Sequence, residues 1–128
     1  MCVILVAEDD VVIRNLINII LSRAGYAVLL ACDGVEAVEI SDRHDGQIDL
    51  LLSDVTMPRL GGIALLARLR VQRPDLKALL ISGRTSSEIV RGNDSFDFMA
   101  KPFLPAQLRA KIELMLAPDH GGPDVDMI

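Results

Sequence analysis

The sequence predicts one α/β domain in which a parallel sheet of five strands is covered by five helices on its two faces. Two observations lead to this fold class. Short apolar runs alternate along the chain with segments in which apolar residues recur at helical spacing. The chain has 128 residues, which is enough for one hydrophobic core and too few for two domains. Parallel strands joined by helices through right-handed crossovers satisfy both observations.

Five segments are predicted to be strands because they are short, apolar and bounded by polar or turn residues. The run Leu50–Leu52 is typical of a strand that is buried on both faces, since it contains no polar residue at all. The five predicted strands span Val3–Ala7, Ala27–Ala31, Ile48–Ser53, Lys77–Ser82 and Phe96–Ala100.

The first two helices are the best defined. In the first, Ile13, Leu16, Ile17, Ile20 and Leu21 form one apolar face, and Gly25 is a suitable residue to end it. The second is predicted from Asp33 to about His44, because Asp33 and Glu36 have the spacing of a capping box.

The other three helices are predicted from weaker signals. Apolar residues from Ile63 to Leu69 mark a third helix, which must end before Pro74. A short fourth helix is expected within Ser86–Arg91, and Pro105 is a favourable first residue for the last helix. The periodicity ends at Pro118, so we expect a domain over residues 1–117 and a loose tail over residues 118–128.

Composition argues against several classes of protein. Thirteen basic and 18 acidic residues give a net charge of −5, which repels a phosphate backbone and disfavours direct nucleic acid binding. No apolar stretch is long enough to cross a membrane, and the N-terminus lacks the pattern of a signal peptide. We therefore expect a cytoplasmic protein without membrane contact.

Polar residues stand at the end of four predicted strands, either as the last residue of the strand or directly after it. Taken singly, such residues are most often turns or helix caps. In a parallel sheet, however, they gather at one edge, which is where ligands bind in this fold class. The set comprises Glu8, Asp9 and Asp10, then Asp54, Ser82 and Lys101.

The charges of this set predict a metal site. Two carboxylates about 4 Å apart repel each other by roughly 4 kcal/mol at an effective dielectric constant near 20, so the acidic cluster needs a counter-charge. Oxygen ligands without His or Cys suit Mg²⁺. Lys101 and Ser82, on the far side of Asp54, are able to hold an anion. A carboxylate between metal and lysine is placed to accept a phosphoryl group.

Four motifs in order, VAEDD, SDVTMP, ISG and AKPF, resemble those of the receiver domain of bacterial two-component response regulators. The resemblance covers about Cys2 to Ala117. It implies a flavodoxin-like, doubly wound three-layer sandwich with strand order 2-1-3-4-5. In that order Cys2 and Cys32 lie at opposite ends of neighbouring strands, about 13 Å apart, which predicts two free thiols.

The resemblance also implies a role for each site residue. Asp54 would be the phosphoacceptor, and Lys101 would contact the phosphoryl oxygens. Mg²⁺ would be held by Glu8, Asp9 and Asp54, with the backbone carbonyl of Thr56 as a further ligand. Asp10 has no metal role and is better explained as the N-cap of the first helix.

Two further pairs of residues would control the response. Ser82 matches the switch hydroxyl, and Phe98 stands where the family often has Tyr, so its ring has no hydroxyl to donate. Thr56 and Arg84 would flank the water that hydrolyses the acyl phosphate. Thr56 is too short to orient that water, and Arg84 either shields the phosphoryl oxygens, which slows hydrolysis, or points into solvent.

The resemblance implies a signalling switch that is phosphorylated by a sensor histidine kinase or a histidine phosphotransfer protein and is not an enzyme. No effector domain follows Ala117, so output is expected through a downstream protein partner, or the chain is a receiver taken from a hybrid sensor kinase. One alternative is a Mg²⁺-dependent phosphohydrolase, which usually has a second Asp where this chain has Thr56. Another is a degenerate receiver that serves only for docking.

Overall fold

The computed structural model describes residues 1–83 and 95–117. Its strands form one five-stranded parallel sheet in the order β2-β1-β3-β4-β5, which confirms the predicted fold class and strand order. The strands are β1 (Val3–Ala7), β2 (Ala27–Ala31), β3 (Leu50–Asp54), β4 (Lys77–Ser82) and β5 (Asp97–Ala100). The helices are α1 (Val11–Arg23), α2 (Gly34–Arg43), α3 (Gly62–Arg70) and α5 (Pro105–Leu116).

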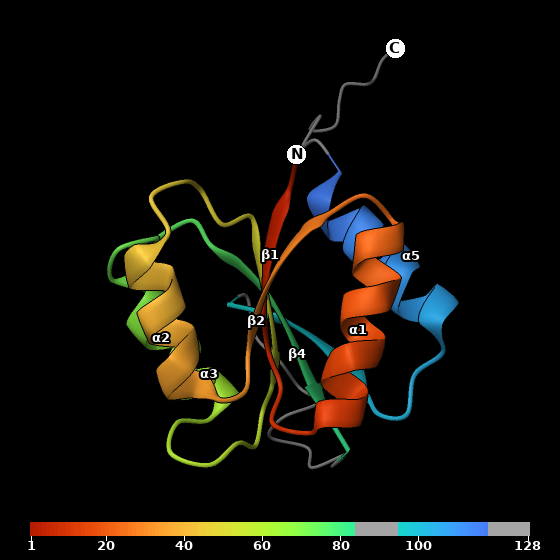
Figure 1. Cartoon of the computed structure of the whole chain (residues 1–128), viewed down its shortest axis with the longest axis horizontal. Helices are drawn as coiled ribbons and strands as arrows, with labels where there is room; N and C mark the ends of the chain where they lie inside the picture. Colours follow the sequence, from red (N-terminus) through yellow and green to blue (C-terminus); the bar gives the residue numbers. More distant parts are fainter. Residues whose placement is uncertain (84–94, 118–128) are drawn as a thin grey trace.

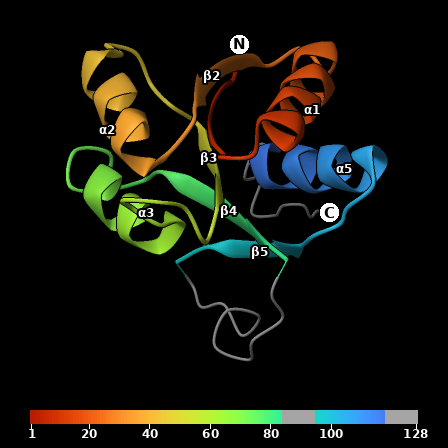
Figure 2. The same cartoon turned by 60° about the horizontal axis from the view of Figure 1, so that its bottom comes forward.

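Helices cover both faces of the sheet, as Figures 1 and 2 show: α1 and α5 lie on one face, and α2 and α3 on the other. The described ranges thus contain four of the five expected helices. The fourth, expected within residues 86–91, and the expected tail over residues 118–128 lie outside the described residues. The domain boundary after residue 117 therefore stays a prediction.

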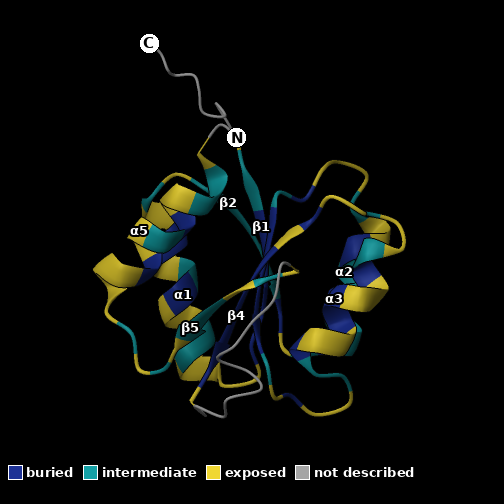
Figure 3. Cartoon of the chain, turned by 180° about the vertical axis from the view of Figure 1, so that it is seen from behind, coloured by how far each residue is buried: buried dark blue, intermediate teal, exposed yellow. Residues whose placement is uncertain are grey.

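The core has two layers, one on each side of the sheet (Figure 3). Leu51 belongs to the layer under α2 and α3, whereas Leu50 and Leu52 belong to the layer under α1 and α5. All three leucines are fully buried, as their unbroken apolar run predicted. The central strand β3 therefore holds its last residue, Asp54, at a fixed depth in the sheet.

One predicted strand boundary is wrong in an instructive way. The third strand begins at Leu50 rather than Ile48. The Asp49 N–H donates to the Val3 carbonyl at 2.8 Å, but the Val3 N–H donates to the Asp49 carboxylate, also at 2.8 Å, so a side chain accepts this bond instead of a main-chain carbonyl. At its other end β3 continues through Asp54, so this carboxylate belongs to the strand itself rather than to the loop after it.

The predicted caps of α1 and the free thiols are confirmed. The capping box expected at the start of α2 is only half formed: Asp33 accepts the Glu36 N–H, but Glu36 accepts the Cys32 N–H instead of that of Asp33. Asp10 is the N-cap of α1 and accepts hydrogen bonds from Val12 and Ile13, and Gly25 follows the helix with φ +95°. Cys2 and Cys32 are both free, at opposite ends of the paired strands β1 and β2. Within the described ranges, no helix combines the length and the apolar character that crossing a bilayer requires.

Gly62, the first residue of α3, touches the strand that carries the site. A Cβ at this position would lie 2.4 Å from the Asp54 carbonyl oxygen and 3.0 Å from Ser53 Oγ. Alanine normally stabilises a helix relative to glycine. We nevertheless expect Gly62→Ala to lower the free energy of unfolding by about 1–3 kcal/mol, because the methyl group must displace the end of β3.

Urea denaturation measures this loss. Gly83→Ala is the control, because no atom lies within 4 Å of the Cβ that it would add. A Gly62→Ala protein as stable as the wild type would contradict the close packing of α3 on the end of β3.

Candidate functional site

The acidic residues meet at the carboxyl edge of the sheet. Ala7 pairs with Ser53 in the parallel register, so the residues that follow, Glu8 and Asp54, are neighbours. Glu8 is fully buried and Asp54 is 8% exposed, whereas Asp9 is exposed. One carboxylate oxygen from each of Glu8, Asp9 and Asp54 lies within 4.8 Å of the other two. The predicted acidic cluster is therefore assembled by the strand register.

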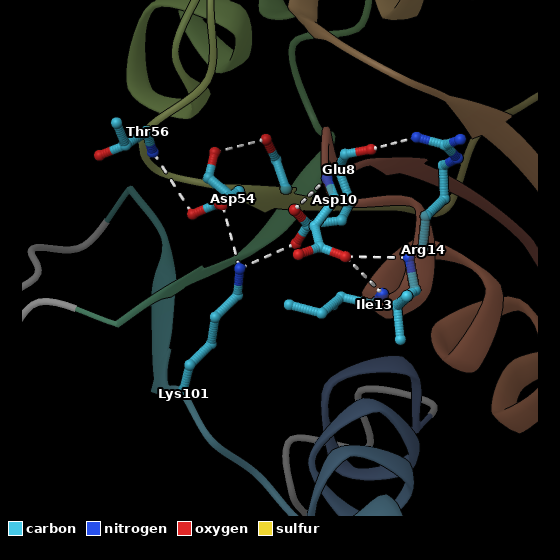
Figure 4. A network of polar contacts seen from close by, with 9 residues as sticks. Glu8, Asp10, Ile13, Arg14, Asp54, Thr56 and Lys101 are labelled. Atoms are coloured by element: carbon cyan, nitrogen blue, oxygen red, sulfur yellow. Dashed lines mark hydrogen bonds and ion pairs between the residues drawn. The ribbon is translucent and has the colours of Figure 1, made fainter.

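Lys101 lies closer to the cluster than the sequence predicted. The Lys101 main chain is fixed because its N–H donates to the Ser82 carbonyl at 2.8 Å. Its Nζ is 3.0 Å from Asp54 Oδ2 and also 3.0 Å from Glu8 Oε1 (Figure 4). The ammonium therefore bridges both carboxylates instead of lying only beyond Asp54. Burial opposes its charge, but the two carboxylates outweigh burial and raise the pKa of Lys101.

Glu8 is the most constrained group of the site. Its Oε2 accepts a hydrogen bond from the Asp10 N–H at 3.1 Å, and burial raises the pKa of its carboxyl group. Its Oε1 is buried and ion-paired with Lys101, yet it has no hydrogen bond of acceptable geometry. A buried carboxylate oxygen with spare lone pairs, beside two further carboxylates, is a donor set that fits a hard divalent cation.

The predicted switch residues lie on neighbouring strands. Ser82 is the last residue of β4 and is 2% exposed. Leu80 pairs with Phe98 and Ser82 pairs with Ala100, so alternation places Ser82 and Phe98 on the same face of the sheet. Phe98 is only partly buried. The register therefore brings the two predicted switch residues close to each other.

Of the two residues predicted to flank the hydrolytic water, Thr56 and Arg84, only Thr56 belongs to the described residues. Thr56 is exposed, and its N–H donates to Asp54 Oδ1 over a long 3.4 Å. Arg84 lies outside the described residues.

Sequence reasoning missed another arginine at this edge: Arg14 of α1 donates to the Glu8 carbonyl at 2.9 Å. The only sequence signal for that contact is a basic residue in the first turns of the helix after the acidic motif.

The raised pKa of Glu8 gives a prediction about stability and pH. A raised folded-state pKa favours the protonated form, so the stabilisation from Glu8 is complete below its ordinary pKa and is lost as the pH rises through the raised value. Glutamine imitates the protonated carboxyl group. In metal-free buffer we expect Glu8→Gln to be more stable than the wild type at neutral pH, and this advantage to shrink as the pH falls.

Paired urea titrations of the two proteins at several pH values measure the difference. Glu113→Gln is the control, because its carboxylate lies on the exposed side of α5, where an ion pair contributes little. A Glu8→Gln protein that is less stable than the wild type at neutral pH would show that burial does not dominate at Glu8.

The fold and the site together define a class: a doubly wound parallel sheet whose carboxyl edge carries an acidic cluster paired with a partly buried lysine. The response regulator receiver domain matches residues 4–113, and the chain belongs to this family. Its functional class is that of a receiver in two-component signal transduction.

Named relatives and solved structures agree with this family. Sensor kinase CckA of Brucella abortus (strain 2308) is 38% identical over an alignment of 117 positions, which covers 89% of this chain and 12% of that protein. Response regulator MprA of Mycobacterium leprae (strain TN) is 40% identical over an alignment of 130 positions, which covers 97% of this chain and 56% of MprA. The chain thus spans only part of the length of these relatives.

Two crystal structures illustrate the shared fold. The receiver domain of the hybrid histidine kinase CckA has a TM-score of 0.78 and 33% identity, covering 89% of this chain and 98% of that chain. The chemotaxis protein CheY4 of Vibrio cholerae has a TM-score of 0.81 and 28% identity, covering 91% and 99%. The predicted resemblance to receiver domains is therefore confirmed.

Proposed function

We propose that this chain is a phosphoacceptor receiver that takes a phosphoryl group onto Asp54 from a histidine of a sensor kinase or a phosphotransfer protein. The observation that carries the proposal is the position of the Asp54 carboxylate, 3.0 Å from the Lys101 ammonium and beside Glu8 and Asp9. Such transfer takes place in the cytoplasm. The chain is a switch rather than an enzyme with its own turnover, and its output passes to a partner protein.

The residues of the site have distinct roles in this reaction. An Asp54 carboxylate oxygen attacks the phosphorus of the donor phosphohistidine, the phosphorus–nitrogen bond breaks, and the imidazole leaves. Lys101 orients the transferred group and neutralises its negative charge. Mg²⁺ would be held by Glu8, Asp9, Asp54 and the Thr56 carbonyl, and when bound it would add the positive charge that three acidic groups require.

Phosphorylation changes the charge balance at the edge of the sheet, and this provides the switch. Lys101 forms ion pairs with two carboxylates in the unmodified protein. A phosphoryl group on Asp54 competes for the same ammonium and offers acceptors to the Ser82 hydroxyl. Ser82 and Phe98 share a face of the sheet, so a shift of Ser82 leaves room for the ring to move inward.

Incubation with acetyl phosphate, followed by intact mass spectrometry, tests the function. With Mg²⁺ present, the protein should gain the mass of one phosphoryl group, and with a chelator in place of Mg²⁺ it should gain none. Equal incorporation with and without metal, or none in either case, would contradict the proposal. A chromogenic phosphomonoester separates the switch from a phosphohydrolase, because only the hydrolase would turn it over.

Thr56 and Arg84 are proposed to set the lifetime of the acyl phosphate. Asparagine at position 56 has a carboxamide that orients water for in-line attack, so Thr56→Asn should speed autodephosphorylation several-fold. Arg84→Ala should also speed it several-fold by uncovering the phosphoryl oxygens, where a factor of ten equals about 1.4 kcal/mol of barrier. Decay of phosphorylated protein after removal of the donor measures both. Equal decay rates for the Arg84→Ala protein and the wild type would show that the Arg84 side chain does not shield the phosphoryl oxygens and points into solvent.

A further inference from the structure

A salt bridge ties the loop after Asp54 to the start of α2. Arg59 Nη2 donates to Asp33 Oδ2 at 2.6 Å, across 26 residues of sequence. Asp33 is the N-cap of α2, and its other oxygen accepts the Glu36 N–H at 2.8 Å. Both oxygens of the Asp33 carboxylate are thus engaged, one within the helix and one with the loop.

The backbone at Arg59 is in a conformation that an arginine does not adopt without support. Its φ is +71°, in the left-handed region, and within residues 1–83 and 95–117 it is the only non-glycine residue with positive φ. The Leu60 N–H donates to the Pro58 carbonyl at 2.8 Å, which closes a three-residue turn centred on Arg59. Turns of this kind with positive φ are rare and strained, so something outside the turn must hold it.

Asp33 is suited to hold the turn centred on Arg59 in place. Exposed ion pairs generally contribute little, because both side chains must be ordered. Here only the arginine is exposed: its side chain is 60% accessible, whereas that of Asp33 is 13% accessible. The bond from the Glu36 N–H and the Arg59 guanidinium both lower the pKa of Asp33. The bond from the Glu36 N–H also fixes this carboxylate independently of the arginine.

A second contact fixes the same junction. A Cβ at Gly34, the first residue of α2, would lie 2.3 Å from the Leu60 carbonyl oxygen. The backbone of the loop therefore packs directly on the start of α2, next to the salt bridge. At its other end the loop is closed by the Gly62 N–H, which donates to the Val55 carbonyl at 2.9 Å. Thr56 lies inside the loop that these contacts hold.

We propose that Arg59 is a positioning residue for the metal site: its salt bridge to Asp33 holds the loop over residues 55–61 in the conformation that presents Thr56 to Mg²⁺. This inference rests on the proposed function, which assigns the Thr56 carbonyl to the metal. Without the salt bridge the turn at Arg59 relaxes toward negative φ. The conformation that binds metal is then only partly populated, and the apparent affinity falls by that fraction.

The direction in which Arg59→Ala changes the Mg²⁺ affinity distinguishes a positioning role from a purely electrostatic effect. Removing a cation from the protein should leave Mg²⁺ affinity unchanged or increase it if charge alone matters. Loss of positioning should instead weaken binding. We expect Arg59→Ala to weaken Mg²⁺ binding about three- to tenfold, less than the roughly 10- to 100-fold seen when a direct partner of a ligand is lost. Arg59→Gly should bind nearly as the wild type, because glycine adopts positive φ without strain.

Isothermal titration calorimetry with Mg²⁺ alone measures these affinities, and circular dichroism verifies that each variant is folded. Arg109→Ala is the matched control, because it removes a similarly exposed arginine, 56% accessible, from an ion pair on α5. Its affinity should equal that of the wild type.

Asp33→Asn provides the second arm. Asparagine keeps the N-cap but loses the charge, so the variant should weaken binding as Arg59→Ala does. The double variant should be no weaker than either single one. Arg59→Ala binding Mg²⁺ as tightly as the wild type, or additive losses in the double variant, would overturn the positioning role. A wild-type protein that binds no Mg²⁺ would instead refute the proposed function.

Discussion

Asp54→Asn should abolish phosphorylation of the protein. The amide is a poor nucleophile, and among the described residues the only other carboxylate paired with the Lys101 ammonium is that of Glu8, which is proposed to hold the metal. Intact mass spectrometry after incubation with acetyl phosphate and Mg²⁺ should find only unmodified protein. The expected loss is complete, which makes this the largest effect that we predict.

Asp10→Asn is the control for this substitution. It makes the same chemical change two residues after Glu8, and asparagine is as good an N-cap as aspartate. The Asp10→Asn protein should therefore fold and be phosphorylated as the wild type is. Persistent phosphorylation of the Asp54→Asn protein would show that another residue is the phosphoacceptor.

Lys101→Met should impair both stability and phosphorylation. The Lys101 side chain is 17% exposed and is the counter-charge for Glu8 and Asp54, so its removal leaves two buried carboxylates without a cation. We expect a loss of about 1–3 kcal/mol in the free energy of unfolding in metal-free buffer at neutral pH. The rate of phosphorylation by acetyl phosphate should fall about 100-fold or more, because the transferred group loses its main protein cation.

Two further variants make this prediction specific. Lys111→Met removes a lysine from an exposed ion pair with Asp97 and should change neither quantity much. Glu8→Gln added to Lys101→Met removes one of the two unpaired carboxylates and should recover much of the lost stability. It should not recover phosphorylation. A Lys101→Met protein with wild-type stability and rate would show that the bridge contributes to neither.

Much of the site follows from the sequence because strand topology alone brings the residues together. Once β1 and β3 are parallel neighbours, Glu8 and Asp54 must lie side by side, and the three buried leucines before Ser53 predict such a strand. Asp10 as an N-cap is equally local, because the hydrogen bonds join residues two and three apart. The strand and the cap need only the identity of neighbouring residues, whereas the strand order that places β1 beside β3 was implied by the resemblance to receiver domains.

The remaining features depend on contacts between side chains that are far apart in the sequence. The bridge from Lys101 to Glu8 requires the side chain to cross the end of β3, and no periodicity indicates that. The salt bridge between Arg59 and Asp33 depends on a backbone turn with positive φ at an arginine, which residue preferences disfavour. The third strand was predicted to start at Ile48 and starts at Leu50, because the Val3 N–H bonds to the Asp49 side chain instead of a main-chain carbonyl.

The most direct test of Asp54 as a metal-dependent phosphoacceptor is the binding of beryllofluoride, an analogue of the phosphoryl group, measured with and without Mg²⁺ by fluorine NMR. If Asp54 is the phosphoacceptor, it binds the analogue, and Lys101 and the metal neutralise the negative charge of the bound group. A bound fluorine signal is therefore expected for the wild type only when Mg²⁺ is present, and none is expected for Asp54→Asn. Binding of equal strength with and without Mg²⁺ would contradict a metal-dependent phosphoacceptor site.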